Sequence, residues 1–258
     1  MILDEIAAYT RTRVEALKKH KSLYDVRDEA EGRPAGKDFY GALAAPGLSV
    51  IAELKQASPS KGLIAPDFER IFLDKARQYE EGGAAAISCL TEPKFFLGSD
   101  EYLRKVRAAV QLPILRKDFT IDEYQIYEAK CLGADAVLLI CSLLSEAQLA
   151  EYLCQAHELG LSALVEAHDA DEVGAAIAAG AAIIGVNNRN LKDFSVNPLN
   201  SLRLREQIPA EKLFVAESGI AKASDCAGLK AAGVQAVLVG EALMRSADTA
   251  AMLREMRA

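Results

Sequence analysis

Charged and amide side chains occur at the ends of short apolar segments in this chain. They are Glu53, Lys55, Lys117, Glu166, Asn187, Arg189 and Glu217. Lysine and glutamate can exchange protons with a bound substrate when burial or neighbouring charge tunes their pKa values. A structural ion pair explains any one of these residues equally well. Their recurrence at so many segment ends favours a shared acid–base site.

The two lysines of this set are candidate general acids. A lysine becomes a better acid when burial or positive neighbours lower its pKa from about 10.4. Lys55, Lys117 and Arg189 would lower one another's pKa in a shared site, whereas Glu53 and Glu166 would raise the pKa of the lysines. The sequence therefore leaves the direction of the shift open.

Two glycine-containing turns near the end of the chain predict an anion site. Ser218 and Gly219 precede a helix predicted over 223–231, and Gly240 and Glu241 open the last helix. Backbone N–H groups at such turns and helix starts bind phosphate. We expect the side chain of Glu241 to point outward while its backbone N–H faces the anion.

The larger organisation is a repeat of an amphipathic helix, a glycine and a short apolar strand. Continuous apolar runs are typical of strands buried on both faces, as in a parallel sheet. The glycines suit the left-handed ends of helices, and they are Gly83, Gly133, Gly160, Gly180 and Gly233. Eight strands are predicted, at 49–54, 84–90, 113–118, 134–140, 161–167, 181–187, 213–218 and 234–240.

Eight β/α units in residues 47–258 predict an α/β protein with a closed (β/α)8 TIM barrel. A doubly wound open sheet is the alternative, because the repeats do not encode closure. Residues 1–46 form a helical extension with a helix predicted over 4–21, and one domain is expected over 1–258. Barrel enzymes place their chemistry at the carboxyl ends of the strands, where strand alternation puts Glu53 and Lys55 on one face.

The bulk composition excludes several classes of function. The 258 residues carry a formal net charge of −7, which argues against a nucleic-acid surface but not against a small anionic substrate. The five cysteines and three histidines lack ligand spacing, so no metal is expected and the cysteines are expected to be mostly buried and free. No apolar stretch suits export or a membrane span, which indicates the cytoplasm.

Six motifs in order resemble those of the indole-3-glycerol-phosphate synthase family. They are IAELKQASPSKG (51–62), ILRKDF (114–119), LVEAH (164–168), GVNNRNL (185–191), AESGI (216–220) and VLVGEALM (237–244). They cover the ends of six predicted strands, and the resemblance extends over essentially the whole chain. Ala242 stands where many members carry serine, a change that a phosphate site built from backbone groups tolerates.

The resemblance implies a substrate and a reaction. The substrate is 1-(2-carboxyphenylamino)-1-deoxyribulose 5-phosphate, and ring closure with loss of CO2 and water gives indole-3-glycerol phosphate without a cofactor. The implied catalytic residues are Lys117 as general acid and Glu166 as acid or base for the later steps. Glu53 and Asn187 would orient these groups, and Lys55 would hold an anionic part of the substrate or share the acid role.

The resemblance also implies substrate contacts. Ser58 and Lys61 lie on a first loop expected to fold over the substrate, and Phe119 is expected to pack on its aromatic ring. Arg189 and Glu217 complete the predicted binding residues. Phe95 and Phe96 could pack on the same aromatic ring, but core packing is the stronger interpretation for these two residues. The partner is a phosphorylated small molecule, with neither nucleic acid nor membrane, and association with other tryptophan-pathway enzymes stays open.

Three alternatives keep parts of this pattern. A Schiff-base aldolase uses a lysine at a strand end and forms a covalent adduct. A sugar-phosphate isomerase uses the same fold and releases no CO2. A phosphometabolite-binding subunit without activity needs the phosphate turns but not the lysines and glutamates together.

Overall fold

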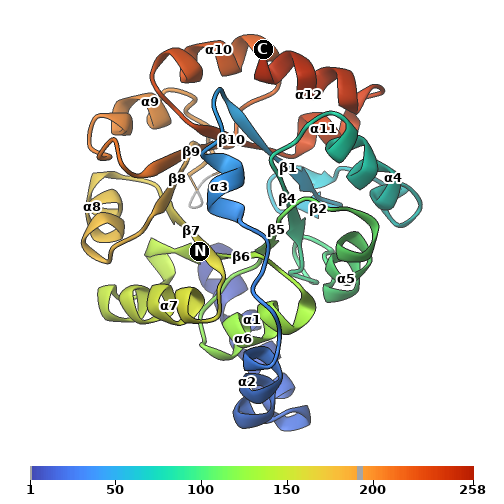
Figure 1. The fold of residues 1–258 in the computed structure, drawn as a ribbon, viewed down its shortest axis with the longest axis vertical. Helices are drawn as coiled ribbons and strands as arrows, with labels where there is room; N and C mark the ends of the chain where they lie inside the picture. Colours follow the sequence, from blue (N-terminus) through green and yellow to red (C-terminus); the bar gives the residue numbers. More distant parts are fainter. Residues whose placement is uncertain (1, 191–193) are drawn as a thin grey trace.

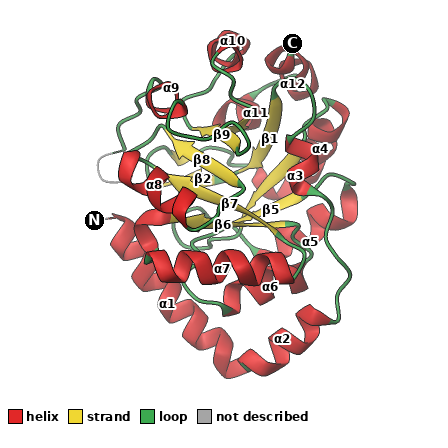
Figure 2. Ribbon diagram, turned by 60° about the vertical axis from the view of Figure 1, so that its left-hand side comes forward, coloured by secondary structure: helices red, strands yellow, loops and turns green. Residues whose placement is uncertain are grey.

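The eight main strands close into a parallel barrel in the order β1-β10-β9-β8-β7-β6-β5-β4. The computed structural model describes residues 2–190 and 194–258. Figures 1 and 2 show the ring of strands surrounded by helices. The strands are β1 (Ser49–Leu54), β4 (Ala86–Leu90), β5 (Ile114–Lys117), β6 (Ala136–Ile140), β7 (Ser162–Ala167), β8 (Ile183–Asn187), β9 (Leu213–Glu217) and β10 (Ala236–Val239).

Closure settles the choice between a barrel and an open sheet. The first strand pairs with the last, with Ser49 opposite Ala236 and Ala52 opposite Val239. All eight predicted strands are present, although several begin two residues later than expected. The glycine punctuation is also confirmed, since Gly133 ends a helix with a φ of 89° and its counterparts share the left-handed conformation.

Helices follow the strands around the outside of the barrel. They are α4 (Phe68–Glu81), α5 (Asp100–Ala109), α6 (Tyr124–Leu132), η1 (Cys141–Leu143), α7 (Glu146–Glu158), α8 (Ala170–Ala178), α9 (Asn200–Arg205), α10 (Ala223–Ala231), α11 (Glu241–Arg245) and α12 (Thr249–Arg257). The helix predicted over 223–231 is confirmed. The single last helix was wrong: Asp248 caps a separate helix, so the short α11 stands alone behind β10.

The N-terminal extension contains three helices and reaches both ends of the barrel. They are α1 (Ile2–His20), α2 (Leu23–Glu31) and α3 (Phe39–Leu43). The polar stretch after the first helix contains α2, which sequence analysis missed and which Ser22 caps at its start. In Figure 1, α1 and α2 project beside α6, whereas α3 lies across the centre of the ring of strands.

Side chains fill the barrel from α3 to the opposite end. Phe39 and Leu43 of α3 are fully buried and belong to one apolar cluster with inward residues of the strands, such as Ile51 and Leu115. The same cluster includes Phe119 and, from α1, Ile6. A larger cluster joins the outward faces of the strands to the helices. The barrel interior is therefore a packed core with α3 at one end and α1 near the other.

The expectation that the cysteines are mostly buried and free is met in part. Cys89, Cys131 and Cys226 are buried and free, Cys141 is half-buried, and Cys154 is exposed. Within residues 2–190 and 194–258, we find no helix with the length and apolar character needed to cross a bilayer. That the whole chain is one domain stays a prediction.

Replacing Phe39 tests the role of α3 as a plug. Phe39→Ala removes a fully buried ring from the barrel interior, so we expect it to lower the free energy of unfolding by about 3–5 kcal/mol. Tyr40→Ala on the same helix removes a ring that is 38% exposed, and it should cost less than about 1 kcal/mol. Urea unfolding measures both, and equal losses would contradict the plug.

Candidate active site

The carboxyl ends of the strands enclose a cavity of about 790 Å³. Every site residue predicted from the sequence lines it, namely Glu53, Lys55, Ser58, Lys61, Lys117, Phe119, Glu166, Asn187, Arg189, Glu217, Ser218, Gly219, Gly240 and Glu241. Leu138, Ile140, Ile64 and Phe96 add apolar surface. A mostly preformed cavity with a few converging polar groups is the usual form of a small-molecule site.

Lys117 lies at the centre of the site, between two buried carboxylates. Its ammonium nitrogen is 3.1 Å from Glu166 Oε2 and 3.1 Å from Glu217 Oε2. Both glutamate side chains are 2% exposed. β5, β7 and β9 each supply one of the three groups, so closure of the barrel brings them together.

Neighbouring carboxylates, and not neighbouring cations, determine the direction in which the pKa of Lys117 shifts. Burial lowers the pKa of Lys117, but the carboxylates of Glu166, Glu217 and Glu53 outweigh it and hold that pKa above the ordinary lysine value. Burial raises the pKa of Glu166, yet Lys117 and His168 outweigh burial and the pKa is lowered. Lys117 is therefore a protonated group in the free site.

Glu217 is the carboxyl group of this cluster whose ionised form is disfavoured. Burial first, and then the neighbouring charges of Glu166 and Glu53, raise its pKa to about 7 against the attraction of Lys117. Its Oε1 atom is buried and has no hydrogen-bond partner within the described part of the chain. Three interacting titratable groups share their protons, so the site titrates as a unit.

Lys55 belongs to a separate pair on β1 and the loop behind it. Its nitrogen is 2.5 Å from Glu53 Oε1, while Ser88 donates a hydrogen bond of 3.5 Å to Glu53 Oε2. Glu53 is 4% exposed. The two lysines thus have different carboxylate partners and different positions in the cavity.

Asn187 and His168 hold Glu166 from the side away from Lys117. Asn187 donates through Nδ2 to Glu166 Oε1 at 3.0 Å, and its own Oδ1 accepts from the Arg189 backbone at 2.9 Å. His168 Nε2 lies 3.8 Å from Glu166 Oε1, and Nδ1 lies 3.3 Å from Glu172. Burial lowers the pKa of His168, but the carboxylates of Glu172 and Glu166 outweigh burial, so the pKa of His168 is raised.

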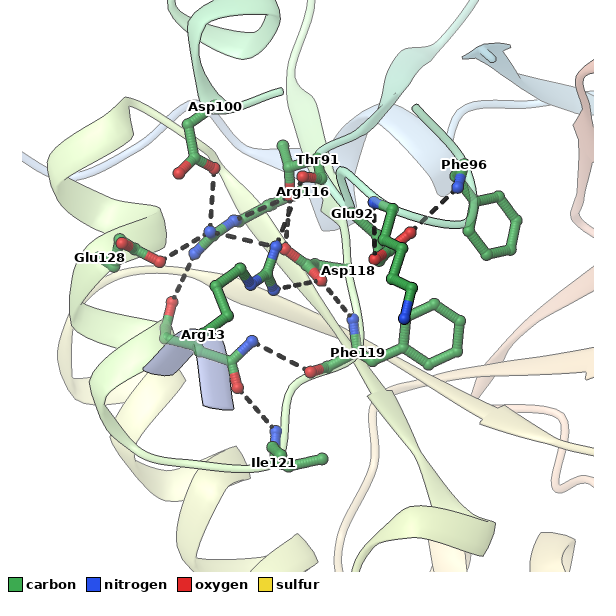
Figure 3. A network of polar contacts seen from close by, with 12 residues as sticks. Arg13, Thr91, Glu92, Phe96, Asp100, Arg116, Asp118, Phe119, Ile121 and Glu128 are labelled. Carbon is green, nitrogen blue, oxygen red and sulfur yellow. Dashed lines mark hydrogen bonds and ion pairs between the residues drawn. The ribbon is translucent and has the colours of Figure 1, made fainter. Parts of the chain in front are cut away.

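Two aromatic rings, Phe96 and Phe119, form one side of the cavity and are called the aromatic wall below. Their centroids are 5.8 Å apart at a tilt of 41°. Phe119 lines the cavity as predicted, and Phe96 does so as well, although core packing was the favoured interpretation for it. Phe95 instead packs edge-on against Tyr9 at 6.1 Å. Figure 3 shows Phe96 and Phe119 with the polar groups behind them.

The first loop forms a small hairpin over the cavity. β2 (Ala57–Ser58) and β3 (Gly62–Leu63) pair antiparallel, with Ser58 opposite Gly62. Lys61 sits in its turn, 3.7 Å from Glu241 Oε2 across the mouth. The hairpin and α11 therefore face each other over the opening.

The predicted phosphate turns lie together at one end of the cavity. Ser218 and Gly219 both have positive φ, at 67° and 77°. Such a conformation is uncommon for serine, and Asn188 stabilises it by donating to the Ser218 carbonyl at 3.0 Å. Gly240 caps the start of α11. The side chain of Glu241 lies between Arg245, at 3.3 Å, and Lys61 at the mouth of the cavity, and its outward orientation beside a bound anion stays a prediction.

Sequence reasoning missed several residues of this site. Asn188 and Arg245 were not singled out, although Arg245 adds a cation beside the predicted phosphate turns. Gly185, inside β8, leaves room for Glu217: a Cβ there would collide with Glu217 Oε1. A glycine in the middle of a strand often marks such a close approach, so that signal was present in the sequence.

Gly240 likewise leaves room for a carboxylate, in this case that of Glu53, which pairs with Lys55. A Cβ at this position would collide with Glu53 Oε1 and lie 3.0 Å from Lys55 Nζ. Among residues 2–190 and 194–258, no group of three or more His, Cys, Asp or Glu side chains is arranged to hold a metal ion.

Comparison with known proteins identifies the family. The family model for indole-3-glycerol phosphate synthase matches residues 3–256. The chain belongs to the indole-3-glycerol phosphate synthase family. The indole-3-glycerol phosphate synthase of Ruminiclostridium cellulolyticum is 55% identical over 260 residues, covering 100% of this chain and 99% of the relative. That of Endomicrobium trichonymphae is 51% identical over 259 residues and covers 100% of both.

Solved structures of more distant proteins share the barrel fold alone. A 3-hexulose-6-phosphate synthase has a TM-score of 0.65 at 19% identity, covering 81% of this chain and 98% of that chain. Thiamine phosphate pyrophosphorylase from Pyrococcus furiosus has a TM-score of 0.61 at 17% identity, covering 81% and 94%. The residues of the family motifs in this chain meet in one cavity.

Gly185→Ala tests whether Glu217 needs the empty space beside it. The added methyl group must displace the carboxylate that holds Lys117, so we expect kcat to fall by about 10- to 100-fold. Gly174→Ala on α8 is the matched control, because a Cβ there meets nothing within 4 Å. Steady-state kinetics distinguish the two, and an unchanged kcat in Gly185→Ala contradicts this reason for the glycine.

The raised pKa of Glu217 predicts a pH-dependent stability. Its pKa rises from 4.5 when exposed to about 7 in the fold, so between these values the folded chain binds a proton that the unfolded chain has released. This contribution is fully present below pH 4.5 and is lost as pH rises through 7. In urea unfolding from pH 5 to 7.5, wild type should therefore lose stability relative to Glu217→Gln. Parallel curves would show that Glu217 keeps an ordinary pKa.

Proposed function

We propose that the Lys117, Glu166 and Glu217 cluster performs the proton transfers of the reaction that defines this family. The chain is a carboxy-lyase of tryptophan biosynthesis that forms indole-3-glycerol phosphate. Ring closure, decarboxylation and dehydration of 1-(2-carboxyphenylamino)-1-deoxyribulose 5-phosphate give this product. The observation that carries the assignment of roles is the buried ammonium of Lys117 held between two carboxylates.

Lys117 acts first, as the general acid. The ring carbon that bears the carboxylate attacks C2′, and the ketone oxygen there becomes basic as its double bond opens. A protonated lysine donates to this oxygen although neighbouring carboxylates raise its pKa, because the alkoxide that would otherwise form is a stronger base. CO2 then leaves from the same ring carbon, which restores the aromatic ring.

Glu166 acts in the dehydration. The C2′ hydroxyl leaves as water when an acid protonates it, and a base removes a proton from C1′. The lowered pKa of Glu166 keeps it ionised and able to accept that proton, while Asn187 fixes the orientation of its carboxylate. Lys55, which is paired with Glu53, holds an anionic part of the substrate or shares the acid role.

The remaining residues bind the two ends of the substrate. The turns at Ser218–Gly219 and Gly240–Glu241, together with the cations Arg245 and Lys61 beside them, form the phosphate end. The aromatic wall packs on the anthranilate ring at the other end. Arg189, in the segment that follows β8, orients the substrate. We further propose that the chain works in the cytoplasm and can associate with other tryptophan-pathway enzymes.

A direct assay tests the proposal. Folded protein supplied with 1-(2-carboxyphenylamino)-1-deoxyribulose 5-phosphate should release CO2 and produce indole fluorescence, with no adduct trapped by borohydride. Lys117→Ala should lower kcat by about 10²- to 10⁴-fold, and change KM far less, because the lysine acts in the transition state.

Two outcomes would contradict these roles. No turnover by folded wild-type protein rejects the reaction, and a Lys117→Ala effect confined to KM makes Lys117 a binding residue. Lys61→Ala is the control for a lysine at the phosphate end. Its side chain is 47% exposed, and its loss should raise KM with little effect on kcat.

A further inference from the structure

A buried carboxylate, Asp118, lies directly behind the aromatic wall. It follows Lys117 at the end of β5 and is 2% exposed. Its Oδ1 accepts from the Phe119 backbone at 2.8 Å, and its Oδ2 accepts from the Thr91 hydroxyl at 2.7 Å. Asp118 therefore joins the ends of β4 and β5, the two strands that lead into the aromatic wall.

Arg13, on helix α1 of the N-terminal extension, supplies the charge that Asp118 needs. Its Nη2 atom lies 2.7 Å from Asp118 Oδ1, and its side chain is 16% exposed. Burial raises the pKa of Asp118, but Arg13 and Arg116 outweigh it and the pKa is lowered. Arg116 lies farther away, at 3.6 Å, and closer to Asp100 and Glu128. Figure 3 shows both guanidinium groups converging on Asp118.

The same oxygen of Asp118 binds Arg13 and the Phe119 amide. Loss of the guanidinium would leave a buried carboxylate with less compensation, and it would move toward Arg116 or toward water. The Phe119 amide is tied to that carboxylate and must follow. On the β4 side, Arg13 Nη1 also donates to the Thr91 carbonyl at 3.5 Å.

Glu92 extends the junction to the second ring. It directly follows Thr91, is fully buried, and accepts from the backbone of Phe96 at 3.0 Å and Phe95 at 2.7 Å. The backbone amide of each residue of the aromatic wall thus donates to a buried carboxylate. Asp118 accepts from the Thr91 hydroxyl, and Glu92 is the next residue in the chain after Thr91. Lys117 is less dependent on this junction, because Glu166 and Glu217 hold its side chain.

We propose that Arg13 is a positioning residue that acts through Asp118 to set the aromatic wall for the aromatic half of the substrate. This inference rests on the proposed function, in which the wall packs on that ring. The proposal predicts different effects on the two halves of the ligand. Arg13 affects binding of the aromatic half. It has no effect on binding of the phosphate, which the ends of β9 and β10 and the start of α11 provide.

The chain offers a matched control on the same helix. Lys18 also joins α1 to the segment after β5, through Asp122 at 2.7 Å, but these side chains are 35% and 30% exposed. In the described part of the chain Asp122 makes no hydrogen bond to the aromatic wall; its side chain accepts from the Tyr124 backbone. Lys18→Met therefore loosens the docking of α1 without disturbing Asp118.

The experiment measures equilibrium binding of two ligands that share a phosphate end. Indole-3-glycerol phosphate carries the aromatic ring, and glycerol 3-phosphate lacks it. By calorimetry, Arg13→Met should bind indole-3-glycerol phosphate about tenfold more weakly than wild type and glycerol 3-phosphate equally well. Lys18→Met should bind both as wild type does. Combining Arg13→Met with Phe119→Leu should add little to Phe119→Leu alone, because both act on one ring.

Three outcomes overturn the proposal. They are unchanged binding of the product by Arg13→Met, equal weakening of both ligands, and an equal effect of Lys18→Met. If Arg13→Met does not fold, Arg13→Lys serves instead, since it keeps the charge without the planar fork. It should bind the product about threefold more weakly and glycerol 3-phosphate normally, and unchanged product binding again overturns the proposal.

Failure of the proposed function gives a different result. Wild-type protein that neither binds indole-3-glycerol phosphate nor turns over the substrate rejects the proposed function, and the role of Arg13 with it. Wild-type protein that does both, beside an Arg13→Met variant with unchanged product affinity, rejects only the role of Arg13.

Discussion

An ammonium group buried at the mouth of the barrel imposes the main constraint on this structure. Removing the charge of Lys117 from water is costly unless carboxylates compensate it at close range. Glu166 and Glu217 do so at 3.1 Å, yet two carboxylates beside one lysine leave a net negative charge that Glu217 resists by a raised pKa. In the proposed mechanism, the same balance that keeps the lysine in place keeps protons available for transfer.

Much of this arrangement follows from sequence patterns with a direct physical basis. Apolar runs separated by glycines predicted the eight strands. Because barrel enzymes place their chemistry at the carboxyl ends of the strands, Glu53, Lys117 and Glu166 were expected in one site, and all three line the cavity. Closure itself was not encoded in the repeats. It depends on the pairing of β1 with β10, a contact between the two ends of the barrel sequence.

What could not be predicted depends on distances between side chains far apart in sequence. The pKa of Lys117 could not be assigned a direction, because the sequence does not tell which carboxylates lie nearest. Phe96 was assigned to the core, since nothing local shows that Glu92 turns its loop toward the cavity. The short hairpin β2–β3 and helix α2 escaped notice because their patterns are brief and polar.

The contact between Arg13 and Asp118 also sets an order of events during synthesis. The two residues are 105 positions apart, so helix α1 leaves the ribosome long before its partner exists. At about 5–20 residues per second, this interval is roughly 5–20 s. Throughout it, the apolar face of α1 must remain without its native neighbours. The aromatic wall of the candidate active site is therefore completed by a segment made well before it, and only after the middle of the chain has arrived.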